Sequence, residues 1–395
     1  MSKVAKAHGM DGTLVEPDWP GLALDEVRAL LSQFPNCGDP VEILSVSPRP
    51  FSAASVVATH GGRVFIKRHH RSVRDREGLL EEHRFIAYLN ARGAPVPRVI
   101  ATASGETAIE SGEWTYEVHE TPAGIDLYED ALSWTPFRSA KHAYSAGRAM
   151  ARLHLFAKGF TAPPRKPRPL VASFSIFAAA DPADGMKHYL AARPALAGDA
   201  ATGKNCDEAL DLLRPFHQEL LPLLPALAPL WTHNDLHASN LFWDEASDDV
   251  DATAIIDFGL ADRTNAVHDL AHAIERNIIE WLVLVQNPAD GDDVPVHRNH
   301  LLAMLDGYES VWPLSAEEAV ALAPMTALCH AEFALSETDY FLDVLHSPER
   351  APMASEGWLV GHARWFHCNA GRKLLDALRH WAAARERHGR RAETQ

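Results

Sequence analysis

Two short stretches decide the fold, His233-Asn234-Asp235-Leu236-His237-Ala238-Ser239-Asn240 and, seventeen residues beyond Asn240, Asp257-Phe258-Gly259. The first fits the pattern H-x-D-x-x-x-x-N, and the second is a D-F-G triplet after an apolar run. Phosphoryl transfer from a nucleotide needs one carboxylate that faces the acceptor hydroxyl, and an amide and a second carboxylate that hold magnesium on the phosphates. Each stretch alone is a weak signal, but the two in this order predict such a site.

A hairpin between the two stretches would bring their side chains together. The runs Leu241–Trp243 and Ala254–Ile256 are expected to be short strands, and their pairing would place Asn240 beside Asp257. We therefore expect Asp235 to be the catalytic base, and Asn240 and Asp257 to be magnesium ligands. The alternative is that the two aspartates are ordinary loop acids near a turn.

A second group of candidate residues lies upstream. The run Arg63–Arg68 alternates as a strand does, which places Lys67 on one face. In the helix that follows, Glu82 shares the apolar stripe with Leu79 and Ile86, where a carboxylate is costly unless it is paired. Lys67 is the expected partner, and a lysine so held would reach the nucleotide phosphates. The alternative is that Glu82 borders the stripe and its carboxylate reaches water.

The pattern of strands and helices divides the chain into three parts. Residues 1–40 are expected to form an arm with one short helix, Leu24–Phe34, and residues 41–120 a nucleotide-binding lobe of strands with one helix, Arg76–Asn90. Residues 121–395 are expected to form a helical lobe with the catalytic loop and the acceptor site. The strands expected in the first lobe are Ser55–His60 and Arg63–Arg68, around a Gly61-Gly62 turn, then Val99–Ala103 and Trp114–His119.

Composition narrows the function classes. The 395 residues are 47% hydrophobic and 23% charged, which is globular rather than disordered composition. The net charge of −16 argues against nucleic acid as a partner. No apolar signal region opens the chain and the four cysteines have no metal-ligand spacing, so we expect a cytoplasmic protein with no membrane partner.

On these residues the chain resembles the aminoglycoside phosphotransferase family of small-molecule kinases, over about Val41 to Phe366. The resemblance implies an α+β, bilobal protein-kinase-like fold, with an antiparallel sheet lobe and a larger helical lobe. It implies Mg²⁺ as cofactor and ATP, or GTP, as co-substrate, and it assigns support of the catalytic loop to Asp269 and His233. The matching residues are Lys67, Glu82, Ala94–Pro97, Gly147–His154, Asp235, Asn240, Asp257 and Asp269-Leu270-Ala271.

Three departures from kinase patterns matter. No G-x-G-x-x-G loop precedes the first hairpin, so Ser52 and Ser55, with backbone amides, are expected to cradle the phosphates. The base-binding hinge is expected around Glu120, but Pro122 has no N–H to offer a base, which leaves ATP and GTP both open. Asn234 stands where glycine is commoner in the family.

The acceptor site is expected in the helical region after Asp257. The carboxylates that would face a cationic acceptor are Asp262, Glu275, Glu332 and Asp339. The acceptor itself is expected to be a small molecule with a hydroxyl, among them amino sugars, amino alcohols and hydroxy amino acids. A solvated or salt-bridged helix face explains each of these acids equally well.

Two other function classes stay open. One is a catalytically silent, kinase-like nucleotide-binding protein. The other is a metal-dependent phosphohydrolase, because His233 and His237 lie four residues apart and a His268-Asp269 doublet follows. The run Gly198–Lys204 matches a phosphate loop, but Asn205 replaces its Ser or Thr and no buried strand precedes it, so we expect an ordinary loop there.

Overall fold

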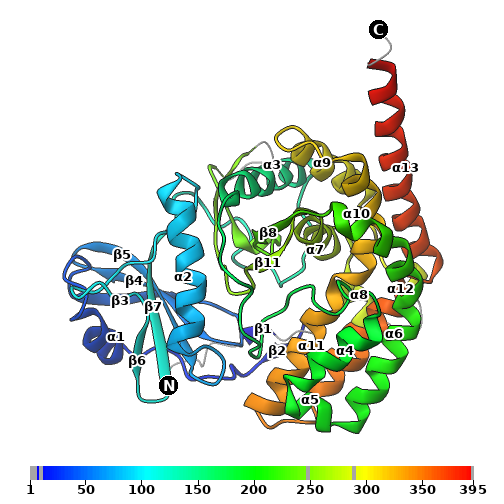
Figure 1. Ribbon diagram of the computed structural model, residues 1–395. Helices are drawn as coiled ribbons and strands as arrows, with labels where there is room; N and C mark the ends of the chain where they lie inside the picture. Colours follow the sequence, from blue (N-terminus) through cyan, green and yellow to red (C-terminus); the bar gives the residue numbers. More distant parts are fainter. Residues whose placement is uncertain (1–6, 9–11, 246–249, 287–290, 393–395) are drawn as a thin grey trace.

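The computed structural model describes residues 7–8, 12–245, 250–286 and 291–392. Its N-terminal lobe is a five-stranded antiparallel sheet with strand order β3-β4-β5-β7-β6, and the larger lobe is mainly helical (Figure 1). The α+β bilobal fold is therefore confirmed. The strands of the sheet are β3 (Pro40–Val46), β4 (Ala53–Thr59), β5 (Gly62–His70), β6 (Ile109–Ser111) and β7 (Trp114–Glu120). A two-stranded pair, β1 (Ala7–His8) and β2 (Leu14–Val15), precedes them.

The turn between β4 and β5 differs by one residue from the prediction. Thr59 pairs with Gly62, so the two loop residues are His60 and Gly61 rather than Gly61 and Gly62. A side chain at position 61 would come within 2.5 Å of the Cys37 carbonyl oxygen, so the close approach of the preceding segment requires glycine there.

The alternation of β5 divides the sheet into two faces. Val64 and Ile66 are buried against α1 (Leu24–Leu31), on the side of the sheet away from the helical lobe. Phe65 and Lys67 therefore point to the opposite face, toward the cleft between the lobes.

On that second face α2 (Arg76–Ala91) lies between the sheet and the helical lobe (Figure 1). Its first turn is capped by the Asp75 carboxylate, which accepts from the Gly78 amide at 2.7 Å. The predicted strand Val99–Ala103 is wrong. Val99 forms a single antiparallel bridge, to His119. The chain then turns, and the Gly105 amide donates to the Thr102 carbonyl at 2.9 Å.

The helical lobe places the catalytic segments on two small antiparallel strand pairs. β8 (Pro229–Thr232) pairs with β11 (Asp262–Asn265), and β9 (Leu241–Trp243) pairs with β10 (Ala252–Ile255). The predicted hairpin between the two motifs is confirmed by the second pair. Part of the acidic loop that joins its strands, residues 246–249, lies outside the described residues.

The helices of this lobe pack around those strand pairs. Helices α3 (Ala140–Ala157) and α9 (Arg298–Glu309) cross closely. A Cβ atom at Gly147 would lie 2.0 Å from the Met304 carbonyl oxygen, so the crossing requires glycine there. The helices are α3 (Ala140–Ala157), α4 (Pro182–Ala191), α5 (Pro194–Gly198), α6 (Ala200–Leu220), α7 (Ala266–Ile278), α8 (Trp281–Gln286), α9 (Arg298–Glu309), α10 (Ala316–Leu328), α11 (His330–Asp339), α12 (His362–Trp365) and α13 (Asn369–Ala392).

Two helical segments bear on predictions from the sequence. The run Gly198–Lys204 is the end of α5 and the first turn of α6, where Asp199 caps the Thr202 amide at 2.8 Å, so it forms no phosphate loop. The helical stretch Ala316–Val344 is long and apolar enough to cross a membrane, but 89% of its apolar window is buried inside the lobe. Its buried residues belong to the hydrophobic core of the helical lobe.

Candidate active site

The catalytic loop turns at Asn234, which has a φ of +60°. This left-handed conformation suits glycine or asparagine, so the residue found here preserves the backbone that glycine would allow. Its side-chain oxygen accepts from the hydroxyls of Thr232 at 2.8 Å and Thr264 at 3.1 Å, and its amide donates to the Leu260 carbonyl at 3.1 Å. Asn234 thus ties the loop to β8 and β11.

Asp269 of α7 fixes the same turn by hydrogen bonds to its backbone. Its two oxygens accept from the backbone amides of His233 at 3.0 Å and Asn234 at 2.7 Å. Burial alone would raise the pKa of Asp269, but the contact with His154 at 2.8 Å outweighs it and holds the pKa below the usual value. His154 is itself fixed by the Tyr308 hydroxyl at 2.7 Å, across the close crossing of α3 and α9.

His233 links the two motifs to each other. Its Nδ1 accepts from the Asp235 amide at 3.2 Å, so its Nε2 carries the proton that it donates to the Ile256 carbonyl at 2.8 Å. The Asn240 side-chain amide donates to the Asp235 carbonyl at 2.8 Å, and the Ile256 amide bonds to the Asn240 carbonyl at 3.0 Å. The loop and the segment before Asp257 therefore form one hydrogen-bonded unit.

Lys67 and Asp257 meet across the cleft. The lysine Nζ lies 3.0 Å from the Asp257 Oδ1. Burial acts to lower the pKa of Lys67 and to raise that of Asp257, but their mutual attraction outweighs it, so the first is raised and the second lowered. Asp257 has a φ of +59°, a strained conformation that is commonest at functional sites. The pair stays charged at neutral pH.

The predicted direct pair between Lys67 and Glu82 does not form. Glu82 is buried, as its place on the apolar stripe predicts, but its ion pair is with Arg165, whose Nη2 lies 3.8 Å away. Arg165 belongs to Ala162–Pro169, a largely exposed loop in which Arg165 itself is buried and donates to the Gly78 carbonyl of α2 at 3.1 Å. A distant arginine thus satisfies the buried carboxylate.

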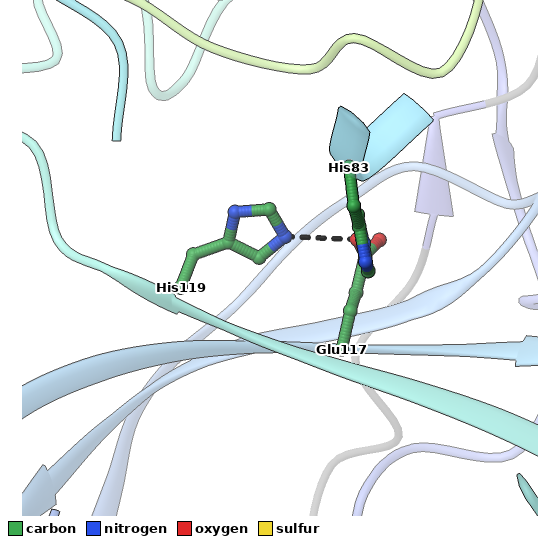
Figure 2. A group of neighbouring side chains, drawn as sticks. All are labelled: His83, Glu117 and His119. Atoms are coloured by element: carbon green, nitrogen blue, oxygen red, sulfur yellow. Dashed lines mark hydrogen bonds and ion pairs between the residues drawn. The ribbon is translucent and has the colours of Figure 1, made fainter. Parts of the chain in front are cut away.

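Glu117 occupies the position opposite Lys67 on the neighbouring strand. Figure 2 shows His83 of α2 and His119 of β7 pointing at its carboxylate, and each Nε2 lies 2.8 Å from the Oε2. His69 adds a third contact, at 3.0 Å to the Oε1. Burial would raise the pKa of Glu117, but the histidine contacts hold it well below the usual value.

This histidine cluster was not predicted, although strand alternation places Glu117 and His119 on the cleft face together with Lys67. The ligand atoms of His83, Glu117 and His119 lie within 4.8 Å of one another, a donor set that suits zinc. The histidines named for a phosphohydrolase, among them His233 and His237, form no such group within the described ranges.

Two adjoining pockets fill the cleft. The first has the predicted nucleotide residues in its wall, namely Ser52, Ser55, Lys67, Glu82, Glu120, Asn240 and Asp257. Ser55 lies in this wall through its backbone, because it pairs with Ile66 and its hydroxyl is buried on the α1 face of the sheet, with no hydrogen-bond partner among the described residues. The second pocket contains Asp235 and shares Lys67, Asn240 and Asp257 with the first. The junction of the two pockets is therefore where the three motif residues converge.

Asp235 contacts a residue that the sequence did not indicate. The Arg276 guanidinium of α7 donates to its Oδ1. Burial raises the pKa of Asp235, and Arg276 opposes this shift only in part. Arg49, from the segment between β3 and β4, lines both pockets and is attracted by Asp235 and Asp257. The missed signal for Arg276 is that it lies two helical turns after Asp269, on the same face of α7.

The four carboxylates expected at the acceptor site line neither pocket. Asp262 accepts from the Arg165 amide at 2.8 Å, and Glu332 accepts from the backbone amides of the segment 173–176. The other two are paired as well: Glu275 with His362 at 3.0 Å and Asp339 with Arg193 at 3.8 Å. Glu275, Glu332 and Asp339 lie on buried helix faces and Asp262 begins the buried strand β11. A single sequence cannot distinguish a face that is buried in the lobe from a face that lines a pocket.

Comparisons with known proteins agree with this geometry. The family model described as "Phosphotransferase enzyme family" (APH) matches residues 50–294. An aminoglycoside phosphotransferase from Alicyclobacillus acidocaldarius shares 15% identity at a TM-score of 0.50, over 93% of this chain and 98% of its own. The amicoumacin kinase hAmiN, in complex with AMP-PNP, Ca²⁺ and Ami, shares 14% identity at a TM-score of 0.51, over 84% of this chain and 96% of its own.

A third solved structure, a spectinomycin phosphotransferase in complex with ADP and spectinomycin, shares 12% identity at a TM-score of 0.50, over 88% of this chain and 98% of its own. At these identities the solved structures show a common fold. No curated protein matched the sequence. Since the family model covers more than half of the chain, the chain belongs to the phosphotransferase enzyme family and is a small-molecule kinase with the protein-kinase-like fold.

Proposed function

We propose that the protein transfers the γ-phosphoryl group of ATP, bound with Mg²⁺, to a hydroxyl of a small molecule. One observation carries the proposal: Lys67 and Asp257 lie 3.0 Å apart at the junction of two pockets, with Asn240 and Asp235 in the same walls. The first pocket would take the nucleotide and the second the acceptor.

The phosphates would lie against Lys67 and the segment that carries Ser52 and Ser55. Ser52 lines both pockets, whereas Ser55 pairs with Ile66 and its side chain shares the α1 face of the sheet, so the Ser55 hydroxyl would not reach the phosphates. The base would contact the hinge at Glu120. GTP is the competing donor, because Pro122 offers no N–H by which the hinge would select adenine.

Asn240 and Asp257 would hold the metal ion. The amide nitrogen of Asn240 is bonded to the Asp235 carbonyl, so its oxygen is the atom left for a cation. Asp257 is kept ionised by Lys67. Two oxygen donors beside phosphate oxygens are the set that magnesium prefers, and a bound magnesium ion neutralises charge on the transferred group.

Asp235 would act as the base. One of its oxygens is fixed by Arg276, and the other would take the proton of the acceptor hydroxyl as the oxygen–phosphorus bond forms and the bond to the leaving diphosphate breaks. The rest of the catalytic effect would come from positioning and charge neutralisation.

The proposal is tested by acceptor-stimulated ADP release with purified protein, magnesium, and either ATP or GTP. The acceptor panel should contain amino sugars, amino alcohols, hydroxy amino acids and uncharged alcohols. Magnesium-dependent release with at least one acceptor would support the proposal. Nucleotide binding with no transfer to any acceptor would favour a catalytically silent binding protein.

A further inference from the structure

The pocket beyond Asp235 is lined largely by apolar side chains. They include Leu132, Trp134, Leu170, Leu260, Leu282 and Phe333. The rings of Trp134 and Phe333 meet edge to face, with centroids 5.8 Å apart and planes at 72°. Such a wall suits a flat or ring-shaped apolar surface.

Trp134 is held in an unfavourable backbone conformation, with a φ of +64°. A bulky residue rarely adopts positive φ, and such strain persists where the surrounding structure determines it, often at ligand sites. The indole is fixed on its other side by Trp358, whose ring centroid lies 4.7 Å away. The indole is therefore packed between the rings of Phe333 and Trp358.

The two aspartates of this pocket are each paired with a cation. Asp235 is bonded to Arg276, and Asp257 to Lys67. Arg74 donates to four backbone carbonyls, at distances from 2.5 to 3.0 Å. Arg49 also lines this pocket and is attracted by Asp235 and Asp257, so neither aspartate is left unpaired for an ammonium group, although the whole chain carries −16.

Among the carboxylates that line this pocket, Glu337 of α11 differs because it has no ionic partner within 4 Å among the described residues. Its side chain is buried, with 1% of the residue exposed, and its Oε2 has no hydrogen-bond partner in the described structure. Burial raises the pKa of Glu337 well above the usual value, and the attraction of Arg276 offsets only part of that shift. A carboxyl group in this state offers an O–H donor rather than a negative charge.

Building on the phosphoryl transfer proposed above, we propose that the acceptor is an uncharged alcohol with a ring-sized apolar body. Its reacting hydroxyl lies at Asp235, its apolar body lies against Trp134 and Phe333, and a second oxygen accepts from Glu337. An ammonium group would meet apolar walls and carboxylates that already have partners, so its desolvation would be uncompensated. This acceptor differs from the cationic acceptor that the four carboxylates of the helical region were expected to face.

A matched pair of acceptors tests the charge. Phenyl β-D-glucopyranoside and its 2-amino-2-deoxy counterpart differ by one ammonium group. In acceptor-stimulated ADP release, the KM of the uncharged sugar should be lower by about tenfold or more. A lower KM for the amino sugar would overturn the inference.

Binding gives a second readout that does not need turnover. Calorimetry in the presence of magnesium and AMP-PNP should show tighter binding of the uncharged sugar. Tighter binding of the amino sugar, or binding of neither, would overturn the inference about the acceptor. The proposed function is measured separately, by magnesium-dependent nucleotide binding and by its loss in Asp257→Asn.

Two substitutions test whether the pocket beyond Asp235 sets the preference for the uncharged sugar. Leu282→Asp places an unpaired carboxylate in the partly exposed rim of the pocket and should shift the preference toward the amino sugar by about tenfold. Leu302→Asp, on the exposed surface of α9, is the matched control and should leave the preference unchanged. An unchanged preference in Leu282→Asp would show that the acceptor binds elsewhere.

Substitutions of Glu337 test its protonation state. Glu337→Gln keeps an uncharged donor and should leave the KM for the uncharged sugar within about twofold, whereas Glu337→Ala should raise it by about tenfold. If Glu337→Gln instead weakened binding of the amino sugar alone, Glu337 would be an ionised partner of a cation and the inference would be wrong.

Discussion

Lys67 of the sheet lobe and Asp257 of the helical lobe are 190 residues apart in the chain, and their charged atoms lie 3.0 Å apart. The contact joins the two lobes at the point where the two pockets meet. It also favours the ionised form of Asp257, because the neighbouring cation lowers the pKa of that carboxyl.

Lys67→Met should therefore weaken binding of the magnesium–nucleotide complex by about tenfold or more. The substitution should also change the pH dependence of magnesium–nucleotide binding. The pKa of Asp257 is lowered by Lys67, so in the variant this pKa rises and binding is lost at a higher pH as the solution is acidified. Calorimetric titrations across the acid range check this. Lys187→Met, on the exposed surface of α4, is the control, and an equal effect there would contradict the assignment.

Asn234 should show two separable contributions to stability. Asn234→Gly keeps the left-handed backbone but leaves the hydroxyls of Thr232 and Thr264 without their acceptor, so the free energy of unfolding should fall by about 1–3 kcal/mol. Asn234→Ala adds the cost of positive φ, so it should be less stable than Asn234→Gly by about 1 kcal/mol. Denaturant unfolding measures both. If the alanine variant were the more stable one, the backbone of the loop would differ from that described.

Glu117 should contribute to stability at neutral pH and less in acid. Its pKa is lowered in the folded protein, so its contribution is present above the pKa of the unfolded chain and is lost as the pH falls through the folded value. Glu117→Gln should lower the free energy of unfolding by about 1–3 kcal/mol at neutral pH. The difference from the natural protein should shrink on acidification, and a difference that is constant with pH would contradict this role.

Removal of tightly bound metal should leave the protein folded and active. The histidines around Glu117 are satisfied by that carboxylate, and the magnesium of the proposed reaction is held by two side-chain oxygens and phosphate, so it exchanges readily. Dialysis against a chelator should leave the Tm unchanged, and activity should return with magnesium alone. A lower Tm that only zinc, manganese or iron restores would instead show a metal ion bound by His83, Glu117 and His119, and would contradict this prediction.

The parts that the sequence predicted are those carried by local patterns. The spacing of Asp235, Asn240 and Asp257 predicted their convergence, because a short hairpin permits few arrangements. Strand alternation likewise predicted that Lys67 faces the cleft. Glu82 was correctly placed on a buried face for the same reason.

The parts that it missed depend on long-range packing. Arg165, the partner of Glu82, lies 83 positions further along the chain, in a proline-rich run whose composition is typical of exposed loops. The role of Glu337 in lining the pocket beyond Asp235 was missed because Glu332 and Glu337 lie on one helix with similar surroundings in the sequence. Only the packing of α11 shows that Glu332 caps a loop, whereas Glu337 lines the pocket.

The central claim is that Asp235 acts on the acceptor and not on the nucleotide. Asp235→Asn keeps the shape of the side chain and removes the base. Turnover at saturating magnesium–ATP should fall by about a hundredfold to ten-thousandfold, while the Kd for magnesium–AMP-PNP stays within about twofold. Lost nucleotide affinity with unchanged turnover would contradict the claim.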